Sequence, residues 1–145
     1  MLRVPVVVLD PELPLPVHAR DGDAGADLRA RLGVELAPGA RAVVPTGVKL
    51  AIPAGHAGFV LPRSGLAVRH GVTVLNSPGL IDSGYRDELC VVLLNTDRSE
   101  PFLVRRGDRI AQLVVQRVEQ LDWEPVAELS TSERGTGRFG HTGVA

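Results

Sequence analysis

Glycine and proline interrupt this chain so often that no stretch keeps an amphipathic helical period for three turns. Sixteen glycines and eleven prolines are spread over 145 residues. Between them, short runs of β-branched and aliphatic residues recur about every eight to twelve residues. Short strands at such regular spacing are typical of a β-sandwich or β-barrel. The sequence therefore predicts an all-β fold.

Turns rich in glycine and proline separate the predicted strands. The strands are expected at residues 4–9, 26–30, 42–44, 48–52, 58–61, 72–75, 89–95, 102–104 and 110–118. The run Pro45-Thr46-Gly47 predicts a turn between the third and the fourth of them. Only residues 64–70 could form a helix, and that helix would be short.

Size and charge exclude several functional classes. The chain is one ordinary domain, which buries about 70% of the surface that its unfolded form exposes. Its formal net charge is −1, and three Phe, one Trp and one Tyr offer little surface for stacking bases. The apolar runs are too short to span a membrane, and the amino end lacks the layout of a signal peptide. We therefore expect a cytoplasmic protein that binds neither nucleic acid nor membrane.

Cysteine and histidine usage argues against disulfide and zinc chemistry. The single cysteine, Cys90, cannot form an internal disulfide, and its place in an apolar strand favours a buried, unreactive thiol. The four histidines are scattered without the spacing of metal ligands. The sequence also contains no nucleophile elbow and no Walker loop.

The segment from Asn76 to Leu89 sets one acid, Asp82, and the only tyrosine, Tyr85, in a glycine-rich stretch between two predicted strands. We therefore expect both side chains at the tip of a hairpin. A lone ring on such a turn is either a packing plug or a platform for a ligand, and the residues alone leave both interpretations open.

A second segment could bind an anion. Arg63, Ser64 and Gly65 follow an apolar strand and open the predicted helix, so that backbone N–H groups, a hydroxyl and a guanidinium converge there. The plain alternative is a serine N-cap beside an exposed arginine.

Two polar residues in predicted strands need partners. Asp27 either bonds its own backbone or, beside a polyphosphate, holds the waters of a Mg²⁺ ion. Gln112 interrupts the apolar face expected from Ile110 and Val114. Its amide could be satisfied by backbone, by a phosphate or by a catalytic water.

The carboxyl-terminal part changes character. Residues 1–125 are expected to form the β-domain, and residues 126–145 are expected to form a flexible arm, because their glycine-rich composition cannot pack a core. Arg134, Arg138, Phe139, His141 and Thr142 are spaced by glycines, as in a loop that wraps an anion and covers it with a ring.

Five segments resemble, in order and spacing, the five motifs of the homotrimeric deoxyuridine triphosphatase (dUTPase) family. They are residues 24–28, 62–67, 76–89, 107–113 and 134–143. The resemblance implies a dUTPase-like distorted jelly-roll or β-barrel subunit with one short helix. It also implies a homotrimer, in which each of three active sites is assembled from several subunits and closed by the arm.

The resemblance further implies Mg²⁺-assisted hydrolysis of dUTP to dUMP and pyrophosphate by attack of water on the α-phosphorus. This reaction keeps uracil out of DNA and supplies dUMP for thymidylate synthesis. Asp82 is implied as the general base, and Tyr85 is implied to lie against the deoxyribose and exclude ribonucleotides. The residues implied to bind the uracil edge are Asn76 and the backbone of Leu80, Ile81 and Cys90.

The remaining implied roles concern the phosphates and the arm. Arg63, Ser64, Gly65 and Gln112 are implied to bind the α- and β-phosphates, while Asp27 is implied to contact Mg²⁺ through water only. Phe139 is implied to stack on uracil, and Arg134, His141, Thr142 and Gly143 are implied to reach toward the terminal phosphate.

Two departures and two alternatives accompany the resemblance. The family commonly has glycine where this chain has Asp87 and Arg138. The related dCTP deaminases need a carboxylate ten residues beyond the hairpin aspartate, where this chain has Val92, which we expect to point inward. A catalytically idle nucleotide-binding relative is the other alternative, and the presence of Asp82, Tyr85 and the arm argues against it.

Overall fold

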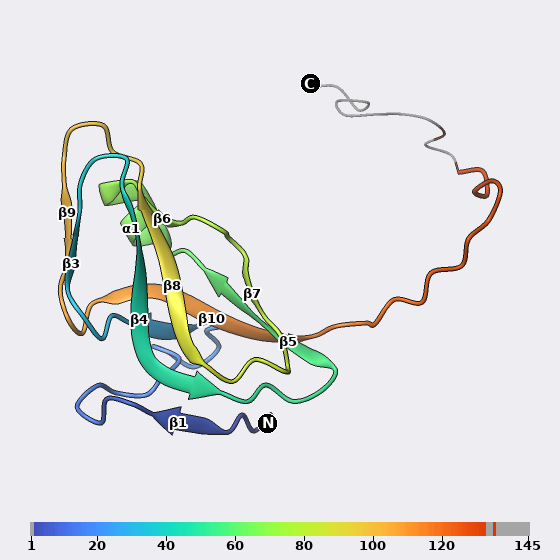
Figure 1. Ribbon diagram of the computed structural model, residues 1–145, viewed down its shortest axis with the longest axis horizontal. Coiled ribbons are helices and arrows are strands. Elements are labelled where there is room, and N and C mark those ends of the chain that lie inside the picture. Colours follow the sequence, from blue (N-terminus) through green and yellow to red (C-terminus); the bar gives the residue numbers. More distant parts are fainter. Residues whose placement is uncertain (1, 133–134, 136–145) are drawn as a thin grey trace.

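Residues 2–132 and 135 are described by the computed structural model, and they form ten β-strands and one helix (Figure 1). The elements are β1 (Val6–Val8), β2 (Ala26–Arg29), β3 (Val34–Leu36), β4 (Arg41–Leu50), β5 (His56–Leu61), α1 (Ser64–His70), β6 (Val72–Val74), β7 (Gly79–Ile81), β8 (Glu88–Asn95), β9 (Phe102–Val104) and β10 (Arg109–Arg117). The predicted all-β fold with one short helix is therefore confirmed.

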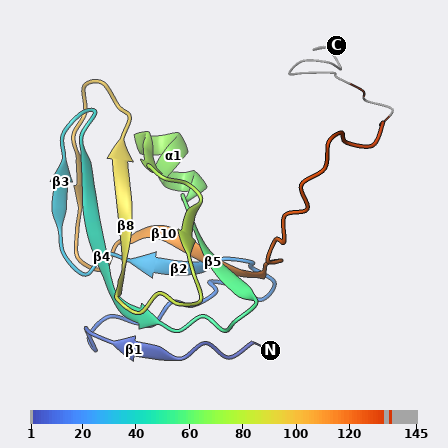
Figure 2. The same ribbon diagram turned by 45° about the vertical axis from the view of Figure 1, so that its right-hand side comes forward.

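The strands form two four-stranded sheets and one two-stranded sheet. The first sheet has the order β1-β4-β8-β6, the second has the order β2-β10-β5-β7, and β3 pairs with β9. Figures 1 and 2 show β4 and β8 running across the second sheet, with one shared core between the two layers. This arrangement is jelly-roll-like. The strands of the described residues do not close into a β-barrel, which is the other arrangement that the resemblance implies.

Alternation along β8 shows how the sequence builds this core. Leu89, Val91 and Leu93 are almost fully buried, while Cys90 and Val92 are half-buried on the opposite face. Successive side chains of a strand point to opposite sides, so one face of β8 packs against the second sheet. The expectation that Val92 points inward is wrong, because its neighbours of opposite parity fill the core.

The turn predicted at Pro45-Thr46-Gly47 is also wrong. β4 continues through these residues, and its register against β8 shifts between Pro45 and Lys49, which is a β-bulge. Proline and glycine are tolerated at a bulge because the ladder hydrogen bonds are interrupted there. Gly47 has φ +79°, a left-handed conformation that favours glycine.

The hairpin prediction is correct only in its outer strands. β6 pairs with β8, as expected, but β7 lies within the connecting segment and pairs with β5 of the other sheet. The sequence around Pro78 and Gly79 has the composition of a turn, and only its neighbour β5 makes it a strand. The three-residue strand β3, Val34–Leu36, was also missed, because so short a run carries little pattern of its own and its pairing with β9 makes it a strand.

The predicted helix is confirmed at residues 64–70. α1 ends at Gly71, whose φ is +62° and whose N–H donates to the carbonyl of Ala67 at 3.1 Å. Arg69 and His70 lie in the last turn, where positive charge favours the helix dipole.

The chain leaves the sheets after β10. Residues 118–132 contain no helix or strand and are exposed, and Figure 1 shows them running away from the sheets. The arm residues Arg134, Arg138, Phe139, His141, Thr142 and Gly143 lie outside the described residues. Within residues 2–132, no helix combines the length and the apolar character that a membrane crossing needs.

The turn between β8 and β9 makes stability depend on pH. Asp97 Oδ1 accepts backbone N–H bonds from Ser99 and Glu100, each at 2.9 Å. These bonds lower the pKa of the Asp97 carboxyl. A lowered pKa stabilises the fold above the ordinary pKa of the group, and this stability is lost as the pH falls through the folded value.

We therefore expect Asp97→Asn to melt at a lower temperature than the wild type at pH 7. The gap should close as the pH falls from about 4 toward 2, where the wild-type carboxyl becomes neutral. Thermal unfolding of both proteins across this pH range measures the difference in melting temperature. A gap that persists at the acid end would show that the charge is not what stabilises the turn.

Candidate active site

A polar pocket of about 390 Å³ lies where β2, β10 and the start of α1 meet. Six of its lining residues carry the chemistry: Asp27, Arg63, Ser64, Gly65, Arg109 and Gln112. Residues from three distant segments thus come together as predicted, and Arg109 joins them.

Charge in this pocket centres on Asp27. Its Oδ1 lies 3.1 Å from Arg63 Nε and its Oδ2 lies 3.1 Å from Arg109 Nη1, while the side chain is only 14% exposed. Arg63 Nη1 also donates to the Arg109 carbonyl at 3.1 Å. Two guanidinium groups share one carboxylate, and the Asp23 carboxylate also lines the pocket, so the formal charges of the lining balance, while the guanidinium N–H groups suit an anionic ligand.

The start of α1 adds backbone donors. The N-cap residue is Arg63, not the serine of the plain alternative, and no side chain caps the helix. The first N–H groups of a helix have no partner within the helix. Ser64 and Gly65, the first two residues of α1, line the pocket.

Gln112 is held over the same pocket. Its Nε2 donates to the Pro62 carbonyl at 3.0 Å, which is the backbone partner of the plain interpretation. Val114 lines the pocket beside it, as predicted. Ile110 does not share this face, because the register of β10 against β2 shifts between Arg109 and Ala111 and Ile110 is buried in the core.

Gly25 allows the close approach of Gln112. A Cβ on Gly25 would collide with Gln112 Oε1 and lie 3.1 Å from Gln112 Cβ. Any side chain at position 25 therefore displaces the Gln112 amide or moves β2 from β10.

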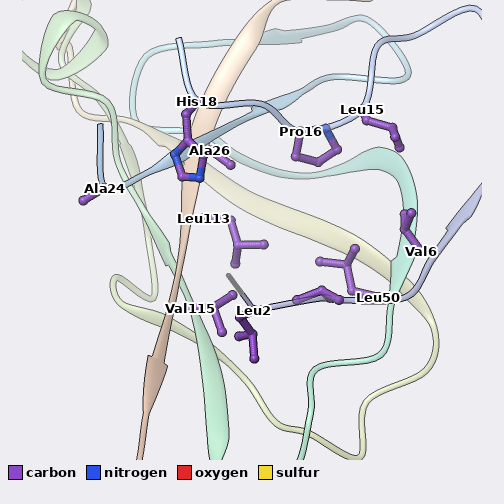
Figure 3. Close-up of a pocket in the computed structure, with 11 residues that line it drawn as sticks. Leu2, Val6, Leu15, Pro16, His18, Ala24, Ala26, Leu50, Leu113 and Val115 are labelled. Atoms are coloured by element: carbon purple, nitrogen blue, oxygen red, sulfur yellow. The ribbon is translucent and has the colours of Figure 1, made fainter. Parts of the chain in front are cut away.

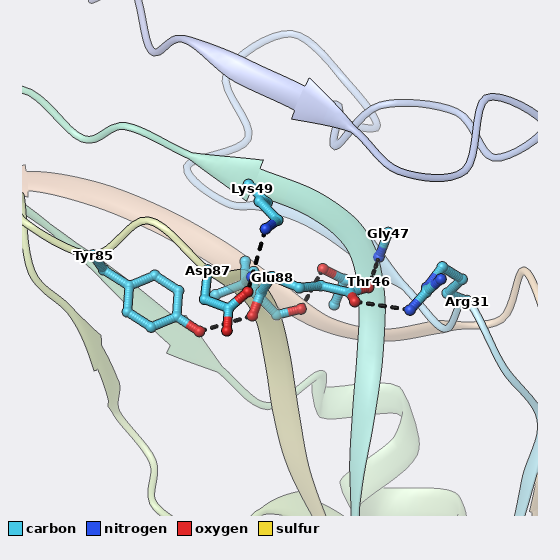
Figure 4. A network of polar contacts seen from close by, with 8 residues as sticks. Arg31, Thr46, Gly47, Lys49, Tyr85, Asp87 and Glu88 are labelled. Carbon is cyan, nitrogen blue, oxygen red and sulfur yellow. Dashed lines mark hydrogen bonds and ion pairs between the residues drawn. The ribbon is translucent and has the colours of Figure 1, made fainter.

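The segment with Asp82 and Tyr85 forms a second group of candidate residues. The Tyr85 N–H donates to the Asp82 carbonyl at 3.1 Å, which closes a turn, and the Asp82 side chain is exposed. The Tyr85 ring is 37% exposed, and its hydroxyl donates to the Glu88 carbonyl at 2.7 Å (Figure 4). Partial burial raises the pKa of the Tyr85 hydroxyl, and the nearby Cys90 and acidic side chains add to this effect.

The predicted base-binding residues lie beside this turn. Leu80 and Ile81 are in β7, opposite Phe59 and Gly58 of β5. Asn76 is exposed just before β7, and Cys90 is half-buried in β8. Cys90 was expected to be fully buried. Burial nevertheless raises the pKa of its thiol, and the negative charges of Glu88 and Asp87 raise it further. The thiol therefore stays protonated and unreactive.

The two groups are far apart within one chain. Ile81 pairs with Gly58 at one end of β5, which places Asp82 beside Ala57, while Arg63 follows the other end. Six residues of extended chain separate these positions by roughly 20 Å, at about 3.3 Å per residue. Within one chain, the pocket around Asp27 and the turn that carries Asp82 and Tyr85 are therefore separate.

Three residues that the sequence did not single out hold the turn. Arg31 Nη2 lies 2.8 Å from Glu88 Oε2, and Lys49 Nζ lies 3.4 Å from Asp87 Oδ1 (Figure 4). Each pair joins residues more than 35 positions apart. Spacing along the chain carries no signal for such contacts.

A larger cavity of about 550 Å³ lies elsewhere, between β2, β10 and the amino-terminal segment (Figure 3). Its lining is aliphatic, including Leu2, Leu50, Leu113 and Val115, with His18 as the only titratable side chain among its lining residues. His18 is its only polar side chain, which is too little to bind a chain of phosphates, so its size does not make it the active site.

The residues present fit one kind of metal binding. Within the described part of the chain, no three His, Cys, Asp or Glu side chains gather to hold a metal ion. Mg²⁺ commonly keeps several waters and binds through one or two carboxylates and the phosphates of its substrate. The carboxylates of Asp27 and Asp23, which line the pocket together with two arginines, fit such an ion and do not fit an all-protein cage.

Known proteins resemble this chain in sequence and in fold. The family model described as dUTPase matches residues 12–143. The deoxyuridine 5'-triphosphate nucleotidohydrolase of Thermobifida fusca (strain YX) is 58% identical over 98% of this chain and 79% of its own length. The Streptomyces coelicolor protein of the same name is 56% identical over 98% of this chain and 78% of its own length. The solved structure of Staphylococcus bacteriophage 80alpha dUTPase with dUpNHpp superimposes with a TM-score of 0.88, at 28% identity over 99% of this chain and all of that one.

Proposed function

Because the chain belongs to the dUTPase family, we propose that its pocket and its Tyr85 turn act together to hydrolyse dUTP to dUMP and pyrophosphate. The observation that carries this proposal is the convergence of Arg63, the start of α1 and Gln112 around Asp27. Cationic and backbone donors there suit a chain of phosphates. The reaction keeps uracil out of DNA and supplies dUMP for thymidylate synthesis.

Asp82 is the general base in this proposal. Its exposed carboxylate accepts a proton from the water that attacks the α-phosphorus, and a positioned base of this kind contributes about 10²- to 10⁴-fold to the rate. Asp82 also orients the water, so one side chain supplies both the proton acceptor and the direction of attack.

Arg63, Ser64, Gly65 and Gln112 bind the α- and β-phosphates in the same proposal. Their donors are fixed before the reaction, so they stabilise the negative charge that develops on the phosphates at little reorganisation cost. Asp27 holds the water shell of Mg²⁺. When bound, the ion withdraws charge from the phosphate oxygens.

The turn with Tyr85 selects the nucleoside. The Asn76 side chain and the backbone of Leu80, Ile81 and Cys90 bind the uracil edge and leave little room for a 5-methyl group. Tyr85 lies against the deoxyribose, where a 2′-hydroxyl would need space. Residues 76–90 thus choose base and sugar, while the pocket at Asp27 holds the phosphates.

Each complete site is shared between copies of the chain in a homotrimer. The separation of roughly 20 Å between Asp82 and Arg63 in one chain supports this proposal. So do large apolar side chains that a single chain exposes, including Val43 at 65% and Val68 at 85%. Burial of such side chains against a second copy stabilises an assembly.

Residues 126–145 form the arm that closes a site, and residues 1–125 form the domain that carries the rest. Phe139 stacks on uracil, and Arg134, His141, Thr142 and Gly143 reach toward the terminal phosphate. Closure excludes all water except the nucleophile. We place the enzyme in the cytoplasm, where its nucleotide substrate is found.

Product analysis with dUTP, dCTP, dTTP and UTP tests the proposed function. We expect pyrophosphate release from dUTP far above that from the other three, and no ammonia from dCTP. Ammonia from dCTP would identify a deaminase. Binding of dUTP without pyrophosphate release would identify the idle relative.

We expect Gly25→Ala to lower kcat/KM for dUTP by about one order of magnitude, because the added methyl displaces the Gln112 amide from the pocket. The φ of Gly25 is not in the left-handed region, so alanine itself causes no backbone strain there. Steady-state kinetics and circular dichroism measure the effect. Gln112→Ala is the comparison variant, because it removes the same amide and leaves Gly25 unchanged. The double variant Gly25→Ala/Gln112→Ala should lose no more than Gln112→Ala alone. Additive losses would contradict the assigned contact.

A further inference from the structure

Arg31, just after β2, and the bulge in β4 hold one residue, Glu88, from two sides. Glu88 Oε2 lies 2.8 Å from Arg31 Nη2, and Glu88 Oε1 accepts the Gly47 N–H at 2.8 Å (Figure 4). Next to it, Thr46 Oγ1 donates to the Leu89 carbonyl at 2.6 Å. The side chain of Glu88 is only 15% exposed, so these contacts fix the backbone at positions 88 and 89.

Tyr85 is tied to this fixed point. Its hydroxyl donates to the Glu88 carbonyl at 2.7 Å, and the ring is 37% exposed. The position of the ring therefore follows the orientation of the peptide group at residue 88. Whatever orients that peptide also orients the surface that the ring presents.

Asp87 acts on the preceding peptide group, which meets the one that Tyr85 binds at the Glu88 Cα. Its Oδ1 accepts the Glu88 N–H at 2.7 Å and lies 3.4 Å from Lys49 Nζ. Lys49 stands directly opposite Glu88 in the β4–β8 ladder, immediately after the bulge. A carboxylate that receives both a backbone N–H and an ammonium is held in one rotamer more firmly than by either contact alone.

A glycine at position 87 would provide neither contact. The Glu88 backbone N–H, followed by Lys49, also lowers the pKa of the Asp87 carboxyl, so the group is charged at neutral pH. Asp87, Lys49 and the bulge thus form a frame that sets the direction of the Tyr85 hydroxyl bond.

We propose that Asp87 and Lys49 are positioning residues for Tyr85 and that their ion pair sharpens the discrimination of dUTP from UTP. This inference rests on the proposed contact of Tyr85 with the deoxyribose. Exclusion of a 2′-hydroxyl is steric, and close-packed contacts respond to displacements of a fraction of an ångström. A frame that narrows the range of ring positions therefore raises selectivity without touching the substrate.

The test compares the ratio of kcat/KM for dUTP to that for UTP in the full-length enzyme. Asp87→Asn keeps an oxygen for the Glu88 N–H but removes the charge, and Lys49→Met removes the ammonium but keeps the aliphatic chain. We expect each to lower the ratio about two- to fivefold, the range of an exposed ion pair. The double variant should lower it no further, because both changes remove the same interaction.

A spectroscopic readout follows the ring directly. Tyr85 is the only tyrosine of the chain, so ring labelling with ¹³C gives the signals of one residue. We expect Asp87→Asn and Lys49→Met to shift these signals in the same direction. Asp97→Asn is the matched control, since Asp97 also accepts backbone N–H bonds in an exposed turn and its pKa is also lowered. It should change neither the signals nor the ratio.

Tyr85→Ala tests the role of the ring separately from the positioning role of Asp87 and Lys49. If Tyr85→Ala leaves the ratio unchanged, the proposed role of the ring is wrong. If Tyr85→Ala removes discrimination while Asp87→Asn and Lys49→Met keep the wild-type ratio, the ring selects the sugar and the positioning role is overturned. A ratio that falls equally in Asp97→Asn would also overturn it, because the effect would then be one of general stability.

Discussion

Asp82→Asn should lower kcat for dUTP hydrolysis about 10²- to 10⁴-fold, because the amide cannot accept the proton of the attacking water. Binding of a non-hydrolysable dUTP analogue should change little. Asparagine has the shape of aspartate, and the phosphate pocket around Arg63 is built by other segments. The loss should therefore appear in kcat and not in the dissociation constant.

Pyrophosphate release under single-turnover conditions, together with calorimetric titration of the analogue, measures both quantities. Asp97→Asn is again the matched control, as an exposed acid far along the chain whose loss of charge should leave kcat unchanged. A kcat for Asp82→Asn within a few fold of wild type would mean that another group accepts the proton. Loss of analogue binding would instead make Asp82 a substrate-binding residue.

Two inactive variants should restore activity to each other when their subunits are mixed. Asp82→Asn lacks the base and Arg63→Ala lacks a phosphate contact, but each copy retains the residue that the other has lost. If a site takes these residues from different copies, about a quarter of the sites in a randomly reassembled equal mixture are intact. Such a mixture should recover about that fraction of wild-type activity.

The reciprocal mixture provides the control. The double variant Asp82→Asn/Arg63→Ala, reassembled with an equal amount of wild type, should again give about a quarter of wild-type activity if sites are shared, and about half if each chain holds its own site. Simple mixing without subunit exchange should restore nothing. No recovery after confirmed exchange of Asp82→Asn and Arg63→Ala subunits would mean that both residues serve a site within one chain, and the structure would have to bend by roughly 20 Å to allow it.

Local patterns in the sequence were sufficient for most of the fold. Leu89, Val91 and Leu93 alternate with half-buried residues, so β8 could be recognised from its period of two. α1 could be placed between its apolar strand and Gly71. Pro45 and Gly47 could not be interpreted correctly, because the same residues suit a turn or a bulge, and only the partner strand β8 decides between them.

Local patterns also identified some residues of the candidate site and missed others. Asp27, Arg63 and Gln112 could be named because each is a polar residue that interrupts an apolar or helix-opening pattern, and the structure brings them to one pocket. Lys49 and Arg31 could not, because their contacts with Asp87 and Glu88 join segments that are distant in the sequence and that only the folded chain brings together. The roles of Asp82 and Tyr85 in the reaction stay predictions.

Because β5 separates the Tyr85 turn from the phosphate pocket within one chain, the proposed sharing of sites couples nucleotide binding to the association of subunits. A ligand that spans the Tyr85 turn of one copy and the phosphate pocket of another contacts both only when the copies are joined. Such a ligand binds the assembled protein more tightly than the separate chains, and linkage then requires that it favour association by the same free energy. In the proposed shared site, the substrate therefore stabilises the association of subunits, and dilution of the enzyme and depletion of its nucleotide both shift the equilibrium toward separate chains.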